Sequence, residues 1–201
     1  MNIQTQASQN ILLPLFMKLD GHRILVIGGG KIGLEKITAI LRNDPSAALT
    51  VVAPEILPEI TELSAQYDIR LHNRPFETDD LNSISLVFAA TGLADVNKII
   101  HAESRKRSIL INVADTPALC DFYMSSIVIK GDLKIAISTN GKSPTLGKRM
   151  RAFLEEWLPD SIGEVMERLH RIRNNMKTDF EQKVTELNRL TKVFEESNKG
   201  S

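Results

Sequence analysis

The feature that most constrains the fold is a run of glycines directly after a short apolar stretch. Residues 24–27 read ILVI, and Gly28, Gly30 and Gly33 follow with the spacing G-x-G-x-x-G before a helical pattern. In this strand–turn–helix context the first glycine permits a tight turn, the second lets a pyrophosphate approach the main chain, and the third lets helix pack on strand. The N–H groups at the start of the helix then bind the anion. The motif predicts a dinucleotide-binding fold.

Five short apolar runs alternate with helical patterns through the first half of the chain. They read RILVI, LTVVA, IRLH, SLVFAA and ILINVA. Helical segments are expected between them at 34–41, 57–66, 79–81 and 96–106. Strands that are apolar throughout and alternate with helices are typical of a parallel sheet covered on both faces. We therefore predict an α/β, Rossmann-like domain over residues 1–114.

The pattern changes after about residue 115. The stretch SSIVIKGDLKIAIS consists of two β-rich runs joined by Gly131-Asp132, which predicts a tight hairpin. An isolated hairpin is only marginally stable in water, so this one must extend the sheet, pack on helices or pair with another chain. We predict a β dimerisation segment over residues 115–142.

A helical C-terminal region is predicted over residues 143–201. Ser143 is a candidate N-cap, followed by Pro144 at the first helical position. The sequences SIGE at residue 161 and TDFE at residue 178 are capping boxes that begin two further helices.

Composition excludes several classes of function. Among 201 residues, 25 are basic and 25 acidic, so bulk charge favours neither nucleic acid nor a membrane surface. Cys120 is the only cysteine, which excludes a disulfide framework and a thiolate metal cluster. The four histidines are scattered without helical pairing, so we expect no permanent metal site. The early apolar stretch ILLPLFM is too short for a membrane span. We expect a cytoplasmic enzyme or binding protein.

Two stretches besides the glycine loop are candidates for cofactor contact. The second apolar run ends VVAPE, without an acidic last strand residue to hold the adenine ribose. Either Glu55 or main chain at Ala53–Pro54 takes that role, or Glu55 is a solvated helix-start residue. No arginine stands there to receive a 2′-phosphate, so we predict NAD rather than NADP. Thr91 and Gly92 in AATG either contact the cofactor or form a plain strand-to-helix turn.

Acidic and basic side chains elsewhere are candidates for the chemistry. Asp115 follows the fifth run and should lie at the carboxyl edge of the sheet, over the cofactor crevice, unless it is only a turn residue. Asp121 is a second candidate with the same alternative. The segment KSPTLGKRMR at 142–151 begins a capped helix with four cations, which suits a polyanionic ligand or a solvated helix face.

Together these pieces resemble the precorrin-2 dehydrogenase and sirohydrochlorin ferrochelatase family, the short siroheme synthases that lack the methyltransferase domain. The residues that carry the resemblance cover roughly positions 12 to 155. They read LPLFMKLDGHRILVIGGGKIGLEK, LTVVAPE, AATG, INVADTPALCDFYMSSIV and IAISTNGKSPTLGKRMR. The resemblance implies NAD-dependent oxidation of precorrin-2 to sirohydrochlorin and, in some members, insertion of Fe²⁺ to give siroheme. It also implies a homodimer whose connector strands are exchanged between subunits.

The resemblance also implies roles for individual residues. The NAD-contacting positions of the family fall on the glycine loop and on Lys31, Ile32, Pro54 and Glu55, and its essential aspartate falls on Asp115. The substrate's carboxylates would meet the segment that contains Ser138, Lys142, Ser143, Lys148 and Arg149. The family loop often carries two serines and paired glycines, whereas this chain has Thr139 and Asn140 there.

Two other functions compete with this interpretation. A dimeric NAD-sensing regulatory module without chemistry would carry the same glycine loop. A dehydrogenase of small hydroxy acids would need a substrate domain with a His–carboxylate pair and an orienting arginine, which is hard to fit into the remaining helices. NADH formation with a tetrapyrrole substrate separates these functions.

Overall fold

The computed structural model describes residue 10, residues 12–175 and residues 180–191. The chain forms two compact units, residues 1–124 and residues 125–201. The capping box predicted at residue 178 therefore lies outside the described residues.

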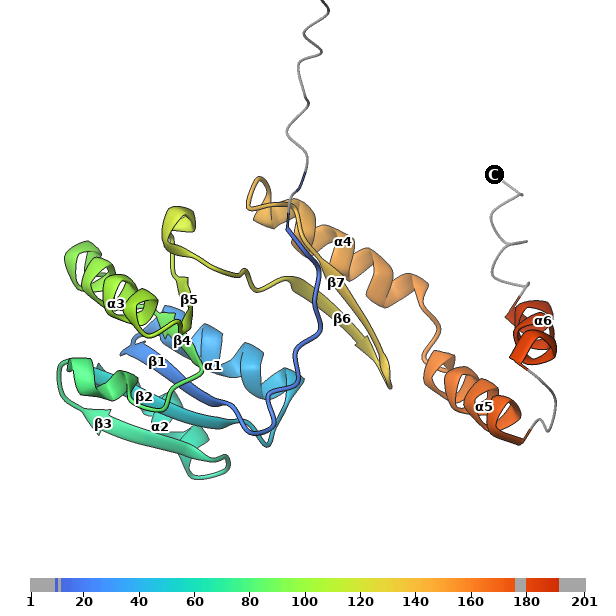
Figure 1. Ribbon diagram of the computed structural model, residues 1–201, viewed down its shortest axis with the longest axis horizontal. Helices are drawn as coiled ribbons and strands as arrows, with labels where there is room; N and C mark the ends of the chain where they lie inside the picture. The colour runs from blue at the N-terminus through green and yellow to red at the C-terminus, as the bar shows by residue number, and fades with distance from the viewer. Residues whose placement is uncertain (1–9, 11, 176–179, 192–201) are drawn as a thin grey trace, which may run out of the picture. The chain divides into compact units, whose positions relative to one another are not determined.

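The first unit is a five-stranded parallel sheet with strand order β3-β2-β1-β4-β5. This arrangement confirms the predicted Rossmann-like α/β fold (Figure 1). The strands are β1 (Arg23–Gly29), β2 (Ala48–Ile56), β3 (Ile69–Asn73), β4 (Leu86–Ala89) and β5 (Leu110–Val113). The connecting segments are α1 (Lys31–Asn43), α2 (Pro58–Ser64), η1 (Thr78–Leu81), α3 (Ala94–Lys106) and η2 (Pro117–Leu119).

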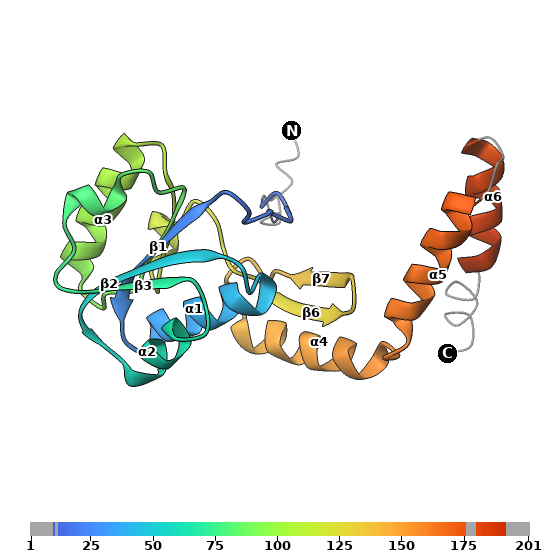
Figure 2. The same cartoon turned by 90° about the horizontal axis from the view of Figure 1, so that it is seen from below.

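Both faces of this sheet are buried, as the continuously apolar strands predict. Successive side chains of a strand point to opposite faces. Ile24 and Val26 pack with Ile37 of α1 on one face. On the other face Leu25 packs with Ile100 of α3. Figure 2 shows α1 and α2 on one side of the sheet and α3 on the other. The carboxyl ends of all five strands therefore meet at a single edge, which is where ligands of open parallel sheets bind.

The second unit begins with the hairpin predicted from Gly131-Asp132. Strands β6 (Ser126–Lys130) and β7 (Leu133–Ile137) pair antiparallel, and Gly131 has a φ of +58° in the turn. They form a two-stranded sheet of their own rather than extending the parallel one. The remaining elements are α4 (Pro144–Trp157), α5 (Ile162–Asn175) and α6 (Phe180–Thr191).

The hairpin packs on helix, one of the three possibilities that the sequence left open. Gly147 of α4 is buried, and a Cβ built there would lie 3.3 Å from Oγ of Ser126 on β6. The absence of a side chain at Gly147 thus lets α4 approach the hairpin closely, and the two lie side by side in Figure 2. Lys130 forms an ion pair with Asp160 next to the start of α5.

No helix in the described part of the chain is long and apolar enough to cross a membrane.

Candidate functional site

The glycine loop between β1 and α1 has the geometry that each glycine of the motif requires. Gly28 has a φ of +123°, and a Cβ there would lie 2.2 Å from the carbonyl oxygen of Ala90. A Cβ on Gly33 would lie 2.0 Å from the carbonyl oxygen of Gly28, so this glycine is what allows α1 to pack on the loop. At both positions a side chain is excluded by main-chain atoms of the protein itself, not by a ligand.

Gly30 differs from these two glycines, because the position that its side chain would occupy is open. A Cβ built on Gly30 would meet no atom of the described chain within 4 Å. Gly30 is the N-cap of α1, it supplies no capping side chain, and the first turn of α1 contains no acidic residue. Uncapped N–H groups and the positive end of the helix dipole face this space. The loop thus fits the pyrophosphate of a dinucleotide, with Lys31 and Ile32 exposed in the first turn.

The end of β2 lies beside this loop and corrects the sequence analysis. We expected the strand to end before Pro54, but β2 continues to Ile56. The register shifts between Ile27 and Gly29, so that Gly29 pairs with Ile56. Pro54 and Glu55, which precede Ile56, are exposed. Glu55 therefore lies next to the last residue of β2 and supplies the acidic residue that the motif expects near the end of the second strand, at a position shifted by the bulge.

Gly29 is a residue of this site that the motif analysis missed. A Cβ on Gly29 would lie 2.3 Å from the carbonyl oxygen of Glu55, and the Gly29 carbonyl accepts a hydrogen bond from Leu57 N at 2.9 Å. The only sequence signal was the run of three consecutive glycines, of which the motif explains two.

The AATG stretch also borders the glycine loop. Ala90 N donates to the carbonyl of Ile27 at 2.7 Å, and Gly92, with a φ of +72°, has open space around it. The Thr91 hydroxyl donates to Oδ1 of the buried Asn97 at 2.7 Å and accepts from Leu93 N at 3.1 Å. The side chain of Thr91 thus organises the start of α3, and its contact with a cofactor stays a prediction.

Asp115 lies at the carboxyl edge of the sheet, two residues beyond the end of β5. Its neighbour Ala114 donates its N–H to the carbonyl of Ala89 on β4 at 2.9 Å. Asp115 is exposed and has a φ of +56°. Left-handed backbone is uncommon outside glycine, although aspartate tolerates it better than most residues, and such conformations cluster at functional sites.

Asp121, the other acidic candidate, is engaged in the fold. Its Oδ1 accepts from Nη1 of Arg105 at 2.5 Å, and its Oδ2 accepts from Ile111 N at 3.1 Å. Both carboxylate oxygens are therefore occupied, which argues for a structural role and against a proton-transfer role.

The predicted substrate residues belong to the second unit. The Ser143 hydroxyl is the N-cap of α4 and accepts from Leu146 N at 3.2 Å, which confirms the predicted cap. Lys148 and Arg149 are exposed on α4, whereas Arg151 lies 3.9 Å from a carboxylate oxygen of Glu155.

The loop before α4 is closed by its own side chains. Oγ of Ser138 accepts from Asn140 N at 3.2 Å, and Lys142 N donates to the carbonyl of Thr139 at 3.0 Å. The Thr139 hydroxyl both accepts from Ser143 N at 3.3 Å and donates to the Ser143 carbonyl at 3.2 Å. Thr139, which departs from the family pattern, therefore has a structural function here.

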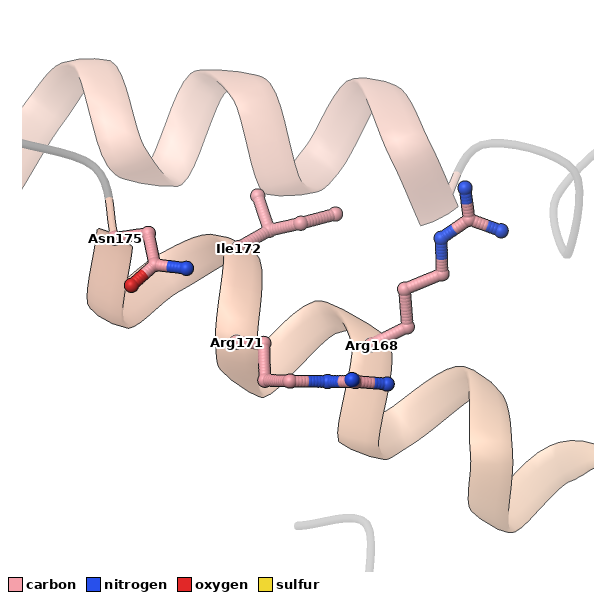
Figure 3. A pocket seen from close by; sticks show the side chains of 4 residues that line it. All are labelled: Arg168, Arg171, Ile172 and Asn175. Atoms are coloured by element: carbon pink, nitrogen blue, oxygen red, sulfur yellow. The ribbon is translucent and has the colours of Figure 1, made fainter.

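A separate hollow of about 700 Å³ lies on α5 of the second unit. It is lined by Arg168, Arg171, Ile172 and Asn175, which all project from this helix (Figure 3). None of the predicted site residues lines it. Within the described residues, no cluster of three or more His, Cys, Asp or Glu side chains could hold a metal ion.

A glycine loop after the first strand of a sheet with order β3-β2-β1-β4-β5 defines the first unit as a Rossmann-like dinucleotide-binding domain. Residues 15–126 match the family described as "Putative NAD(P)-binding", and residues 130–156 match "Sirohaem biosynthesis protein central". The chain belongs to this NAD(P)-binding family, in the form that occurs in siroheme synthases, as the sequence motifs indicated. The family and the open space at Gly30 support NAD as the cofactor.

Relatives and a solved structure agree with this assignment. The chain is 41% identical to "Siroheme synthase" of Ectopseudomonas mendocina over 84% of its own length and 36% of the relative. It is 40% identical to "Siroheme synthase" of Pseudomonas entomophila over 82% of its own length and 35% of the relative. The chain thus spans about a third of the length of these relatives. A solved structure, "SirC, precorrin-2 dehydrogenase", is 28% identical with a TM-score of 0.74, covering 90% of this chain and 89% of that one.

Proposed function

We propose that the protein catalyses the NAD-dependent oxidation of precorrin-2 to sirohydrochlorin in siroheme biosynthesis. The family assignment and the similarity to a solved precorrin-2 dehydrogenase support this proposal. The observation that carries it is the position of Asp115, an exposed carboxylate held in left-handed backbone at the same sheet edge as the glycine loop. An NAD-binding module that only senses its ligand would not need such a carboxylate there.

The residues of the first unit divide the reaction between binding and proton transfer. The loop from Gly28 to Gly33, with Lys31 and Ile32, holds the pyrophosphate, and Pro54 and Glu55 contact the adenine ribose. Thr91 and Gly92 border the nicotinamide half of the dinucleotide. When bound, NAD supplies the hydride acceptor, which is chemistry the side chains cannot perform.

Asp115 acts as the general base in this scheme. The substrate loses one hydride to the nicotinamide and one proton to the Asp115 carboxylate, and the electrons left behind form the new double bond that extends the conjugation. A positioned general base contributes about 10²- to 10⁴-fold to such a step. The main-chain hydrogen bond from Ala114 to Ala89 and the left-handed backbone at Asp115 keep this residue at the sheet edge.

The second unit binds the carboxylates of the substrate. Lys148 and Arg149 are exposed on α4 and provide charge-assisted hydrogen bonds, with Lys142, Ser138 and Ser143 in the loop before the helix. Ser143 and Ser138 already accept hydrogen bonds from main-chain N–H groups, so each hydroxyl acts towards the substrate as a donor.

The protein is further proposed to be a cytoplasmic homodimer formed through the segment after Asp115. The hairpin packs on α4 on one face, but the outer edges of β6 and β7 pair with no other strand among the described residues. Four apolar side chains on α4 are also 40% to 61% exposed and repeat at helical spacing, which makes a continuous stripe: Leu146, Met150, Phe153 and Trp157. Contiguous exposed apolar surface of this kind marks association sites.

In a second reaction, Fe²⁺ would be a substrate and not a resident cofactor. If the protein also inserts iron into sirohydrochlorin, the Asp115 carboxylate accepts the two displaced pyrrole N–H protons one after the other and releases each to water.

The test is an anaerobic assay of the purified protein with precorrin-2 and NAD, followed by addition of Fe²⁺. We expect NADH absorbance to rise with appearance of the sirohydrochlorin spectrum. A protein that binds NAD yet forms no NADH from precorrin-2 would be a sensor, and the proposal would be wrong.

A further inference from the structure

The outer edge of β5 is covered by main-chain and side-chain groups of a following segment, and no sixth strand of the described chain pairs with it. β5 is an edge strand of the five-stranded sheet, with β4 as its only strand partner in the described chain. An edge strand presents N–H and C=O groups that need partners. On β5 these groups are met by two consecutive residues, Cys120 and Asp121, which we name the β5 clamp.

Both residues of the clamp bind β5, and the Cys120 thiol has two further contacts, with the side-chain amide of Asn112 at 3.6 Å and the carbonyl of Thr116 at 3.5 Å. Asp121 N donates to the carbonyl of Ile111 at 2.8 Å, and Oδ2 of Asp121 accepts from Ile111 N at 3.1 Å. Cys120 does the same with its thiol alone. Its Sγ donates to the carbonyl of Val113 at 3.2 Å and accepts from Val113 N at 3.2 Å. A thiol can occupy both roles only while it is protonated.

The thiol is held in that protonated form. Burial raises the pKa of Cys120 above its usual value, and the nearby carboxylate of Asp121 adds to the increase. The main-chain hydrogen bond from Val113 opposes the shift but does not reverse it. At neutral pH the Cys120 Sγ is therefore both a donor and an acceptor towards the main chain of Val113.

The clamp closes a short loop that contains the proposed base. Residues 114–119 lie between Val113 and Cys120, and Asp115 stands near the start of this loop with its φ of +56°. Thr116 N donates to the Val113 carbonyl at 3.4 Å, so the same carbonyl that receives the thiol also closes the turn around Asp115. On the other side Ala114 is anchored to Ala89 of β4.

We propose that Cys120 is a positioning residue for Asp115: its thiol grips the main chain of Val113 and thereby holds the Asp115 carboxylate at the sheet edge. This inference rests on the proposed function, in which Asp115 is the base. Cys120 itself contacts neither substrate nor cofactor in this role. A displacement of a catalytic group by about 1 Å can cost about 10²-fold in rate, so loss of the grip should be visible in kcat.

Three substitutions at Cys120 separate the effect of its two hydrogen bonds to Val113 from the effect of the space that the side chain fills. Cys120→Ala removes both, Cys120→Val fills the space without the hydrogen bonds, and Cys120→Ser restores a donor and an acceptor. Tyr123→Phe is the matched control, because it deletes one hydrogen bond to the Pro117 carbonyl in the same segment but outside the clamp. We expect Cys120→Ala and Cys120→Val to lower kcat about 10- to 100-fold with NAD affinity unchanged. Cys120→Ser and Tyr123→Phe should stay within about threefold of wild type.

The decisive measurement is a double-mutant cycle with Asp115→Asn. If Cys120 acts through Asp115, Cys120→Val causes no further loss of kcat in the Asp115→Asn background, because the carboxylate it positions is already gone. An equal loss in both backgrounds, or wild-type kcat in Cys120→Val, would overturn the positioning role while leaving the proposed function intact. If Asp115→Asn alone keeps the wild-type rate, the role of Asp115 in the proposed function fails first, and the positioning role fails with it. Cys120→Val fills the space of the thiol, and its NAD binding reports whether it is folded, so this variant decides the outcome even if Cys120→Ala does not fold.

Discussion

Gly30 and Gly33 belong to the same motif, yet the structure gives them opposite expected responses to alanine. At Gly30 the backbone has a φ of −86° and a ψ of −167°, which any residue adopts, and an added Cβ meets no atom of the described chain within 4 Å. Alanine is a poorer N-cap than glycine, but it also lowers the entropy of the unfolded chain. These effects offset, so we expect the free energy of unfolding to change by less than about 1 kcal/mol.

The cost of Gly30→Ala should instead fall on NAD binding. A methyl group at this position occupies the space into which the pyrophosphate must come to reach the main chain. Loss of one hydrogen bond to a charged group corresponds to about 1.5–3 kcal/mol. The dissociation constant for NAD should therefore rise by about 10- to 150-fold.

Gly33→Ala is the matched comparison. Its Cβ would lie 2.0 Å from the carbonyl oxygen of Gly28, so helix α1 must move away from the loop. Overpacking of this kind costs about 1–3 kcal/mol of folding free energy, and more where backbone must shift. Calorimetric titration with NAD and denaturant unfolding of both variants measure the two quantities. Wild-type affinity in Gly30→Ala would refute the idea that the pyrophosphate occupies this space.

Four further outcomes follow from the proposed site. Asp115→Asn should leave NAD affinity unchanged and lower dehydrogenase kcat by about 10²- to 10⁴-fold, and near-normal turnover would make Asp115 a turn residue. The protein should prefer NAD to NADP, because Glu55 would repel a 2′-phosphate, and equal kcat/KM for both dinucleotides would contradict this. The double variant Lys148→Glu, Arg149→Glu should raise KM for precorrin-2 while NAD affinity stays within about twofold of wild type. Weakened NAD binding in this variant would contradict their role in binding the substrate. Sedimentation should show a dimer at micromolar concentration that Trp157→Glu shifts towards monomer, and a monomeric wild type would exclude the proposed assembly.

Local patterns were sufficient to predict the first unit. The glycine spacing, the five apolar runs and the intervening helices depend on neighbours in sequence, and the structure has them in the predicted order. The hairpin at Gly131 and the N-cap at Ser143 were likewise predicted from a few adjacent residues, because a turn or a cap is formed by the residues that signal it.

Features that depend on distant partners were not predicted. The bulge that carries β2 past Pro54 arises from pairing between Gly29 and Ile56, and nothing in VVAPE alone indicates that register shift. By local pattern alone Asp115 and Asp121 had the same alternative as turn residues, and only the family resemblance favoured Asp115. They differ because Arg105 on α3 and Ile111 on β5 occupy the carboxylate of Asp121, which only the folded chain brings together.

The central claim is that this chain oxidises precorrin-2 at the expense of NAD, with Asp115 as the base. The most direct measurement is the amount of NADH formed when limiting precorrin-2 is mixed anaerobically with excess NAD and the protein. We expect one NADH for each sirohydrochlorin formed, at a rate that falls with Asp115→Asn while NAD binding persists. NAD binding without NADH formation by the wild-type protein, in the presence of intact precorrin-2, would contradict the claim.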